Sequence, residues 1–244
     1  MDTVRSKAET GDASAEYELG RSILSPRPTD SEYASAMPWI RRSAEQEYAP
    51  AEYMYGRAFS EGRGKDPKQV VYWWTKAAKQ GNVRAQVWLG VLYDQGRDGV
   101  KPDNVEAFKW LSMAAKQGQP DAQVALGQMY ENGEGIPQDY GLAAHWYRQA
   151  ADHTINLGGA GEGANSLALL YQDGHATPQD YVFVYLAYGY KRDTDGMQNV
   201  AQNMDASQIA DAQRRIKAWV KAGEPCPQTA PASLLIPSAT TPTK

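Results

Sequence analysis

The sequence has little cysteine, no long apolar stretch and little net charge, and each shortage argues against a class of protein. A single cysteine, Cys226, leaves no partner for an intrachain disulfide. No run of about 18 apolar residues occurs, so the sequence predicts no membrane insertion. The net charge of −4 argues against a nucleic-acid partner, because phosphate binding needs a basic surface.

Catalytic and metal-binding motifs are also missing. The sequence contains no Gly-x-Ser-x-Gly, and His145, His153 and His175 are scattered without metal-ligand spacing. The segment Gly159-x-Gly161-x-x-Ala164 is similar to part of a dinucleotide fingerprint, but no strand pattern precedes it. We therefore expect a protein that is not an enzyme, with no cofactor and no metal.

One nine-residue block recurs five times along the chain. Its copies are AEYELGRSI at 15–23, AEYMYGRAF at 51–59, AQVWLGVLY at 85–93, AQVALGQMY at 122–130 and GANSLALLY at 163–171. The copies start 36, 34, 37 and 41 residues apart. This period is typical of a helix–turn–helix repeat, and it predicts an all-α protein.

A second block, a tryptophan followed after four residues by an alanine pair, accompanies the first. It begins at Trp73, Trp110 and Trp146, each seven residues after an aspartate, and Trp39 precedes Ser43-Ala44 at the same spacing. The aspartates (Asp66, Asp103 and Asp139) are expected to cap the second helix of each repeat. The tryptophan and the small alanines then form its inner face, where the next repeat approaches.

Glycines mark two features of the repeat. Gly56, Gly90 and Gly127 stand inside the first helices, where glycine is about 1 kcal/mol less favourable than alanine, so a close helix contact is expected there. The turns carry Gly62 and Gly64, or Gly133 and Gly135, which supply the positive φ that ends a helix.

These two blocks together resemble the Sel-one-like repeat family, relatives of tetratricopeptide repeats. The copy at 122–151 matches nearly every position of the pattern. The resemblance implies an α-α solenoid, a right-handed superhelix of helix–turn–helix repeats. We place the repeats at about 15–50, 51–84, 85–121, 122–162 and 163–195, within one solenoid over 1–222. An amphipathic pattern predicts a closing helix at 206–222 with Asp205 as its N-cap, and the Pro/Thr-rich residues 223–244 predict a disordered tail.

The resemblance also implies function. We expect a non-enzymatic scaffold that binds a partner protein on its concave face. The alternative is an immunity protein that neutralises a bacterial secreted toxin, such as a type VI secretion effector. Residues 7–13 read like the end of a helix whose start was removed. The compartment is the bacterial periplasm if that removal took a signal sequence, and the cytoplasm otherwise.

The positions that line the groove in tetratricopeptide relatives can be carried over to each first helix. They are Tyr53, Met54, Arg57 and Glu61; Val87, Trp88, Val91 and Asp94; Val124, Gln128 and Glu131; and Asn165, Gln172 and Asp173.

Two subsets of these positions have competing interpretations. Trp88, Met54, Tyr53 and Arg57 are the expected anchors for a partner, although Trp88 could equally pack in the core between repeats. Glu61, Asp94, Glu131 and Asp173 form an acidic ladder that suits a basic partner or is simply a solvated edge. The glycine-rich insertion at 152–163 is expected to lengthen the groove rim or to contact the partner.

Overall fold

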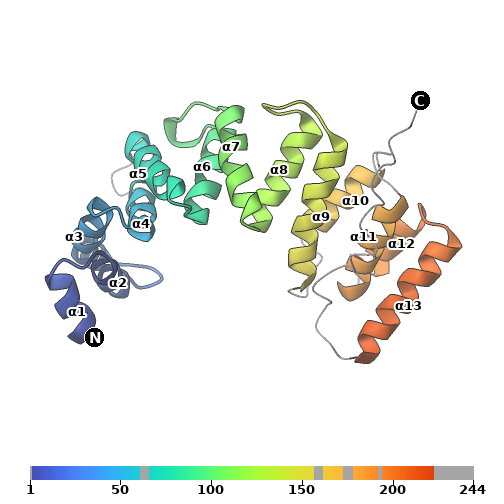
Figure 1. The fold of residues 1–244 in the computed structure, drawn as a ribbon, viewed down its shortest axis with the longest axis horizontal. Helices are drawn as coiled ribbons and strands as arrows, with labels where there is room; N and C mark the ends of the chain where they lie inside the picture. The colour runs from blue at the N-terminus through green and yellow to red at the C-terminus, as the bar shows by residue number, and fades with distance from the viewer. Residues whose placement is uncertain (1, 61–65, 157–161, 173–177, 192–193, 223–244) are drawn as a thin grey trace, which may run out of the picture. The chain divides into compact units, whose positions relative to one another are not determined.

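A computed structural model describes residues 2–60, 66–156, 162–172, 178–191 and 194–222. Within these ranges the chain is helical and contains no strand (Figure 1). Consecutive helices pack against each other within residues 2–116 and within residues 140–201. The protein is therefore an all-α solenoid of helix pairs, as the repeats predicted. The expected tail at 223–244 and the glycines of the insertion at 157–161 lie outside the described residues.

The chain divides into two compact units. The first comprises residues 1–122 with 134–136, and the second comprises 123–133 with 137–244. The helices up to the boundary are α1 (Asp2–Glu9), α2 (Ala13–Ile23), α3 (Asp30–Glu45), α4 (Ala49–Ser60), α5 (Pro67–Lys79), α6 (Val83–Gln95), the 3-10 turn η1 (Arg97–Gly99) and α7 (Asn104–Lys116). The pairs α2/α3, α4/α5 and α6/α7 each form a tight hairpin.

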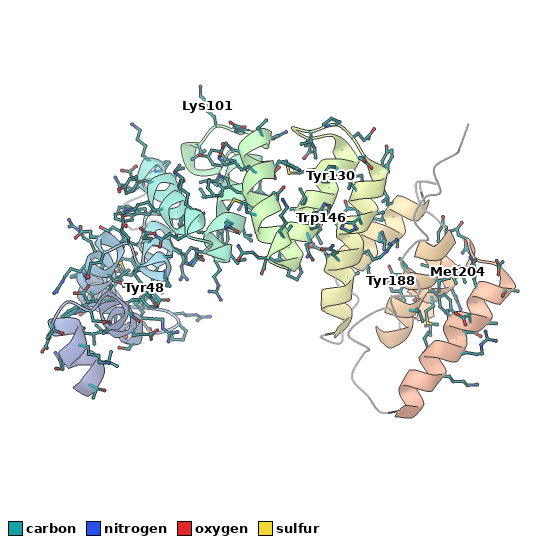
Figure 2. The ribbon with its side chains drawn as sticks, in the orientation of Figure 1. Tyr48, Lys101, Tyr130, Trp146, Tyr188 and Met204 are labelled. Atoms are coloured by element: carbon teal, nitrogen blue, oxygen red, sulfur yellow. The ribbon has the colours of Figure 1, made fainter. Side chains whose placement is uncertain are left out.

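The second unit begins within α8 (Pro120–Asn132) and continues with α9 (Tyr140–Asn156), α10 (Glu162–Gln172), α11 (Pro178–Lys191), α12 (Thr194–Ala201) and α13 (Ala206–Ala222). Its core is built around buried Tyr147, Leu167 and Val184, and Tyr188 and Met204 pack against it (Figure 2). The predicted closing helix is α13, which packs on α11.

Aspartate side chains begin the second helices, as expected. Asp103 Oδ1 accepts hydrogen bonds from the backbone N–H groups of Val105 and Glu106, each at 3.1 Å. Asp66 and Asp139 make the same kind of cap on α5 and α9. Asp205 and Gln208 form reciprocal bonds at the start of α13, so the predicted cap is confirmed. Each cap satisfies N–H groups that the helix itself leaves without a partner.

The inner face of the second helices is aromatic and small, as the sequence predicted. Trp73 and Trp110 are 8% and 3% exposed, and the alanine pairs that follow them are buried. The residue next to each repeat tryptophan packs on the glycine of the first helix in the same hairpin. These pairs are Gly20 with Ile40, Gly56 with Trp74, Gly90 with Leu111 and Gly127 with Tyr147. The interior glycines are thus explained by close helix contact.

Two carboxylates are fully buried in the first unit, at the second position of the repeat block. Glu16 lies 2.7 Å from Nη2 of Arg42, and Glu52 lies 3.4 Å from Nζ of Lys76. Burial raises the pKa of Glu52 above its usual value, and the charge of Lys76 partly offsets this effect. Each carboxylate on a first helix is therefore neutralised by a cation on the second helix of the same hairpin.

In the first unit, a glutamine just after each second helix completes these contacts. Gln46 and Gln80 each donate from Nε2 to the buried carboxylate of their hairpin at 2.7 Å. In the α6/α7 hairpin the carboxylate is replaced by Gln86, whose Oε1 accepts from Gln117 at 2.7 Å. The cation is replaced there by Met113, four residues before Gln117. In this hairpin the carboxylate and the cation are both replaced by neutral side chains, and an amide–amide hydrogen bond takes the place of the charged contact.

Candidate binding pocket between α4 and α6

A pocket of about 220 Å³ opens in the first unit. The first helix of one repeat, α4, contributes Arg57 and Ser60, and the first helix of the next, α6, contributes Trp88, Val91 and Leu92. Its remaining described lining residues are Trp74 from α5 and Arg97 from η1. Three of the predicted groove residues, Arg57, Trp88 and Val91, therefore meet around one cavity.

Three aromatic rings form the wall of this pocket and its support. Tyr53 stacks on Trp74 with ring centroids 6.3 Å apart, and Trp74 lies 6.1 Å from Trp88 at an interplanar angle of 35°. The indole N–H of Trp74 donates to the carbonyl oxygen of Tyr53 at 3.2 Å. Tyr53 and Trp74 are buried, whereas Trp88 is 45% exposed. The wall is therefore buried at Tyr53 and Trp74 and open to solvent at Trp88.

The described lining of the pocket also includes two arginines. Arg57 and Arg97 are both solvent-exposed, and none of the described residues that line the cavity is acidic. A guanidinium presents several N–H donors in a fixed plane and keeps its charge at any ordinary pH. The described lining therefore combines aromatic, apolar and cationic side chains around one cavity.

The comparison with protein families matches the Sel1 repeat model at residues 49–82, 83–119, 120–154 and 161–183, together more than half of the chain. The chain belongs to the Sel1 repeat family. Proteins of this family generally mediate protein–protein interactions. The pocket lies where two of the matched Sel1 repeats, 49–82 and 83–119, adjoin.

Solved structures give the same assignment. The chain is similar to c5321, a protective antigen of uropathogenic Escherichia coli with an SLR fold, at 32% identity and a TM-score of 0.70 over 91% of this chain. It spans 52% of that protein. It is also similar to a Sel1 repeat protein from Oxalobacter formigenes, at 27% identity and a TM-score of 0.56, over 81% of this chain and 73% of the other. No curated protein matches the chain.

The other predicted positions on α4 and α6 lie outside the pocket lining. Met54, Val87 and Asp94 are half-buried, and Tyr53 supports the wall from behind. Burial raises the pKa of the Asp94 carboxyl, with a further contribution from Glu134. Glu61 lies outside the described residues.

Three of the predicted positions in the second unit, Glu131, Asn165 and Val124, already have contacts within that unit. Glu131 accepts a hydrogen bond from the hydroxyl of buried Tyr147 at 2.5 Å. Asn165 is exposed and accepts from the hydroxyl of Tyr188 at 3.0 Å. Gln128 is exposed on α8, and Val124 is buried in the core of the unit. The side chain of Gln172 and the whole of Asp173 lie outside the described residues.

Four lining residues were not among the predicted groove positions. Ser60 and Leu92 lie one turn from predicted positions on α4 and α6. Trp74 follows the repeat tryptophan, at a position where the other Sel1 hairpins carry Ile40, Leu111 or Tyr147. Arg97 belongs to a turn that departs from the Gly-x-Gly pattern. The consecutive tryptophans Trp73-Trp74 were the available signal that this repeat is unusual.

The described part of the chain contains no group of three or more His, Cys, Asp or Glu residues that could hold a metal ion. His145, the one histidine whose side chain is described, lies beside Trp146 and 2.9 Å from the amide nitrogen of Gln149. None of the helices within the described ranges is long and apolar enough to cross a membrane.

Proposed function

We propose that this chain is a non-enzymatic scaffold that binds a partner protein at the pocket between α4 and α6, with Trp88 as the anchor. The observation that carries this proposal is the exposure of Trp88 on the rim of a cavity whose other aromatic wall residue, Trp74, is buried. Repacking that indole against a partner removes a large apolar surface from water. The membership of a family that mediates protein–protein interactions supports the same assignment.

The position of Trp88 favours a binding role over a core role. A core tryptophan of this protein, such as Trp110, is 3% exposed, whereas Trp88 leaves nearly half of its surface in solvent. One side of its ring is held by Trp74, so little side-chain entropy remains to be lost on binding. Tryptophan and arginine are the residues most often found to dominate the binding energy of an interface, and both line this pocket.

The experiment compares three full-length proteins: wild type, Trp88→Ala and the matched control Tyr72→Ala. Tyr72 is an exposed aromatic residue of the same unit, 53% accessible, that does not line the pocket. Proteins captured from the native organism are identified and purified, and their Kd values are measured by calorimetry. We expect Trp88→Ala to weaken the partner by about 30-fold, as for an interface hot spot, and Tyr72→Ala to change it by less than about twofold.

Circular dichroism of the three proteins shows whether the helices survive each substitution. Equal affinity of wild type and Trp88→Ala would refute the site. A wild-type protein that retains no partner in the capture step would refute the scaffold itself. The sequence-based alternative of an immunity protein stays a prediction, and it requires a single partner with a nanomolar Kd that is a toxin.

A further inference from the structure

The residues that follow α13 include one short apolar stretch in an otherwise small and polar sequence. Residues 223–244 are rich in proline, threonine, serine and alanine, and their only large aliphatic or aromatic residues are the consecutive Leu-Leu-Ile at 234–236. Pro231 and Pro237 flank this apolar stretch. Sequences of such composition offer little apolar surface to bury, so three adjacent aliphatic side chains mark the part that gains most from contact with an apolar surface.

The pocket between α4 and α6 offers an apolar surface of matching size. Trp74, Trp88, Val91 and Leu92 contribute its apolar lining, and its volume is about 220 Å³. A dry protein cavity of about 150 Å³ is enough to hold benzene, so the pocket has room for a leucine or isoleucine side chain. Because the Trp88 side chain is 45% exposed, an aliphatic group placed on its indole removes apolar surface of both partners from water.

The two prolines beside the apolar stretch also favour binding. Proline fixes its own φ and restricts the preceding residue to extended conformations. A segment with fewer accessible conformations loses less entropy when it binds. Extended, proline-containing segments are a recurrent class of ligand for surfaces lined by aromatic side chains, and two indoles line this pocket.

From these observations we propose that the apolar stretch 234–236 of one molecule occupies the pocket between α4 and α6 of a second copy of this chain. The pocket belongs to the first compact unit, whereas the apolar stretch follows the last helix of the second unit. Binding between two copies therefore requires no particular arrangement of the two units within one chain. This inference uses the same pocket as the proposed function and goes beyond it, because the chain then competes with the partner protein for Trp88.

The proposed contact joins two different surfaces, so it is heterologous. Each molecule can donate its apolar stretch to one neighbour and accept that of another, and head-to-tail contacts of this kind build rings or open chains. Three side chains bury far less than the roughly 1,200–2,000 Å² of a standard protein–protein interface. The self-association is therefore weak and reversible, and it increases with protein concentration.

Sedimentation velocity of full-length proteins tests the self-association. The stretch variant carries Leu234→Ser, Leu235→Ser and Ile236→Ser, and the pocket variant is Trp88→Ala. The average mass of the wild type should rise with concentration, whereas both variants should stay monomeric over the same range. Circular dichroism verifies that each variant keeps its helices.

A matched control changes three other residues of the same terminal sequence. Thr240→Ser, Thr241→Ser and Thr243→Ser together leave the apolar stretch intact, and this protein should associate as the wild type does. Self-association that persists in both the stretch variant and the pocket variant would assign it to another surface and overturn the inference.

Mixing the two variants gives the decisive arm. Trp88→Ala retains the apolar stretch but has lost the exposed indole of its pocket, and the stretch variant has the opposite defect. Only one of the two possible contacts can form between them. An equimolar mixture should therefore contain a heterodimer and no larger species, although each variant alone is monomeric.

A synthetic peptide of residues 229–239, blocked at both ends, isolates the contact. Its binding to the stretch variant is followed by NMR through the indole N–H signal of Trp88, which the Trp88→Phe substitution assigns. We expect the peptide to shift this signal, and the same peptide with serine at 234–236 to bind at least about tenfold more weakly, because the aliphatic groups supply the apolar contact.

Other results would overturn the inference. A wild type that stays monomeric at every concentration excludes exchange between copies, and a Trp88 signal that still differs from that of the stretch variant then makes the same chain the occupant. A peptide that leaves the signal unchanged excludes the apolar stretch altogether. In either case the proposed function stands if the captured partner depends on Trp88. A partner that ignores Trp88 refutes the proposed function alone, whatever the peptide does.

Discussion

Gly56 and Trp74 lie so close together that a β-carbon on Gly56 would stand 2.5 Å from Cδ1 of the indole and 2.8 Å from Nε1. The glycine thus sets the position of Trp74, which in turn supports Trp88 at the pocket. A contact inside the α4/α5 hairpin therefore controls a surface on the next repeat.

Replacing Gly56 with alanine should destabilise the protein by about 2 kcal/mol, since overpacking forces the indole out of its site. Urea unfolding followed by circular dichroism measures this change. Ser60→Ala, at the end of the same helix, serves as control and should change the stability by less than about 0.5 kcal/mol. An unchanged stability of Gly56→Ala would mean that the hairpin can open without cost.

The Glu52–Lys76 pair gives a second prediction. Lys76→Met leaves the fully buried carboxylate without its cation and should cost on the order of 1–3 kcal/mol. The double variant Glu52→Gln/Lys76→Met reproduces the neutral arrangement seen at Gln86 and Met113, and it should recover most of this loss. Denaturant unfolding of wild type, both single variants and the double variant gives the coupling energy. Additive losses in the double variant would contradict the paired arrangement.

The raised pKa of Glu52 predicts a dependence on pH. In the unfolded chain this carboxyl ionises near its usual value of 4.5, whereas burial keeps it protonated to higher pH in the folded state. The folded state therefore binds more protons over this interval, and stability falls as the pH rises from about 4.5 through the folded pKa. Glu52→Gln abolishes this contribution, so the stability of wild type minus that of the variant should be smaller at pH 7 than at pH 4.

Glu47→Gln is the matched control for that titration. Glu47 faces the same lysine, with Oε1 3.5 Å from Nζ of Lys76, but its side chain is 75% exposed. Its removal should leave the fall in stability between pH 4 and pH 7 in place. An identical effect of the two substitutions would show that burial is not the cause.

In the second unit, the hydrogen bond from Tyr147 to Glu131 is expected to stabilise the protein. Tyr147→Phe leaves the carboxylate without this donor and should lower the unfolding free energy by about 1–2 kcal/mol, as for a hydrogen bond to a charged group. Tyr72→Phe, the same change on an exposed ring, should be neutral. Thermal unfolding compares the two variants. Equal unfolding midpoints would mean that the hydrogen bond to Glu131 does not stabilise the protein, as expected of a solvated carboxylate.

The sequence predicted the repeat architecture because the same residue types recur in each copy and make the same local contacts, such as helix caps. Asp66, Asp103 and Asp139 cap helices through bonds to residues two or three positions on, so their role is visible without the fold. The interior glycines predicted close contacts between helices, but the sequence did not show which residue makes each contact. That residue, next to the tryptophan, differs in every hairpin.

The pocket was harder to predict from the sequence, because some of its lining residues lie at positions where this chain departs from the repeat pattern. Trp74 lies at a position that holds a different residue in each hairpin. Arg97 lies in an irregular turn, so the repeat period does not predict where its side chain points. The burial of Glu16 and Glu52 was likewise hidden, because carboxylates at a helix surface position ordinarily face water. Only the packed structure shows that these carboxylates contact a cation on the following helix and an amide just after that helix.

The pairing of Glu16 with Arg42, and of Glu52 with Lys76, closes within a single hairpin. A whole hairpin can therefore be duplicated or excised by recombination without stranding an ion in the interior. A cut between the two helices of a hairpin would separate the ions and leave a buried charge on one side of the new junction. In these two hairpins, therefore, the buried carboxylates favour exchange of whole hairpins over exchange of single helices.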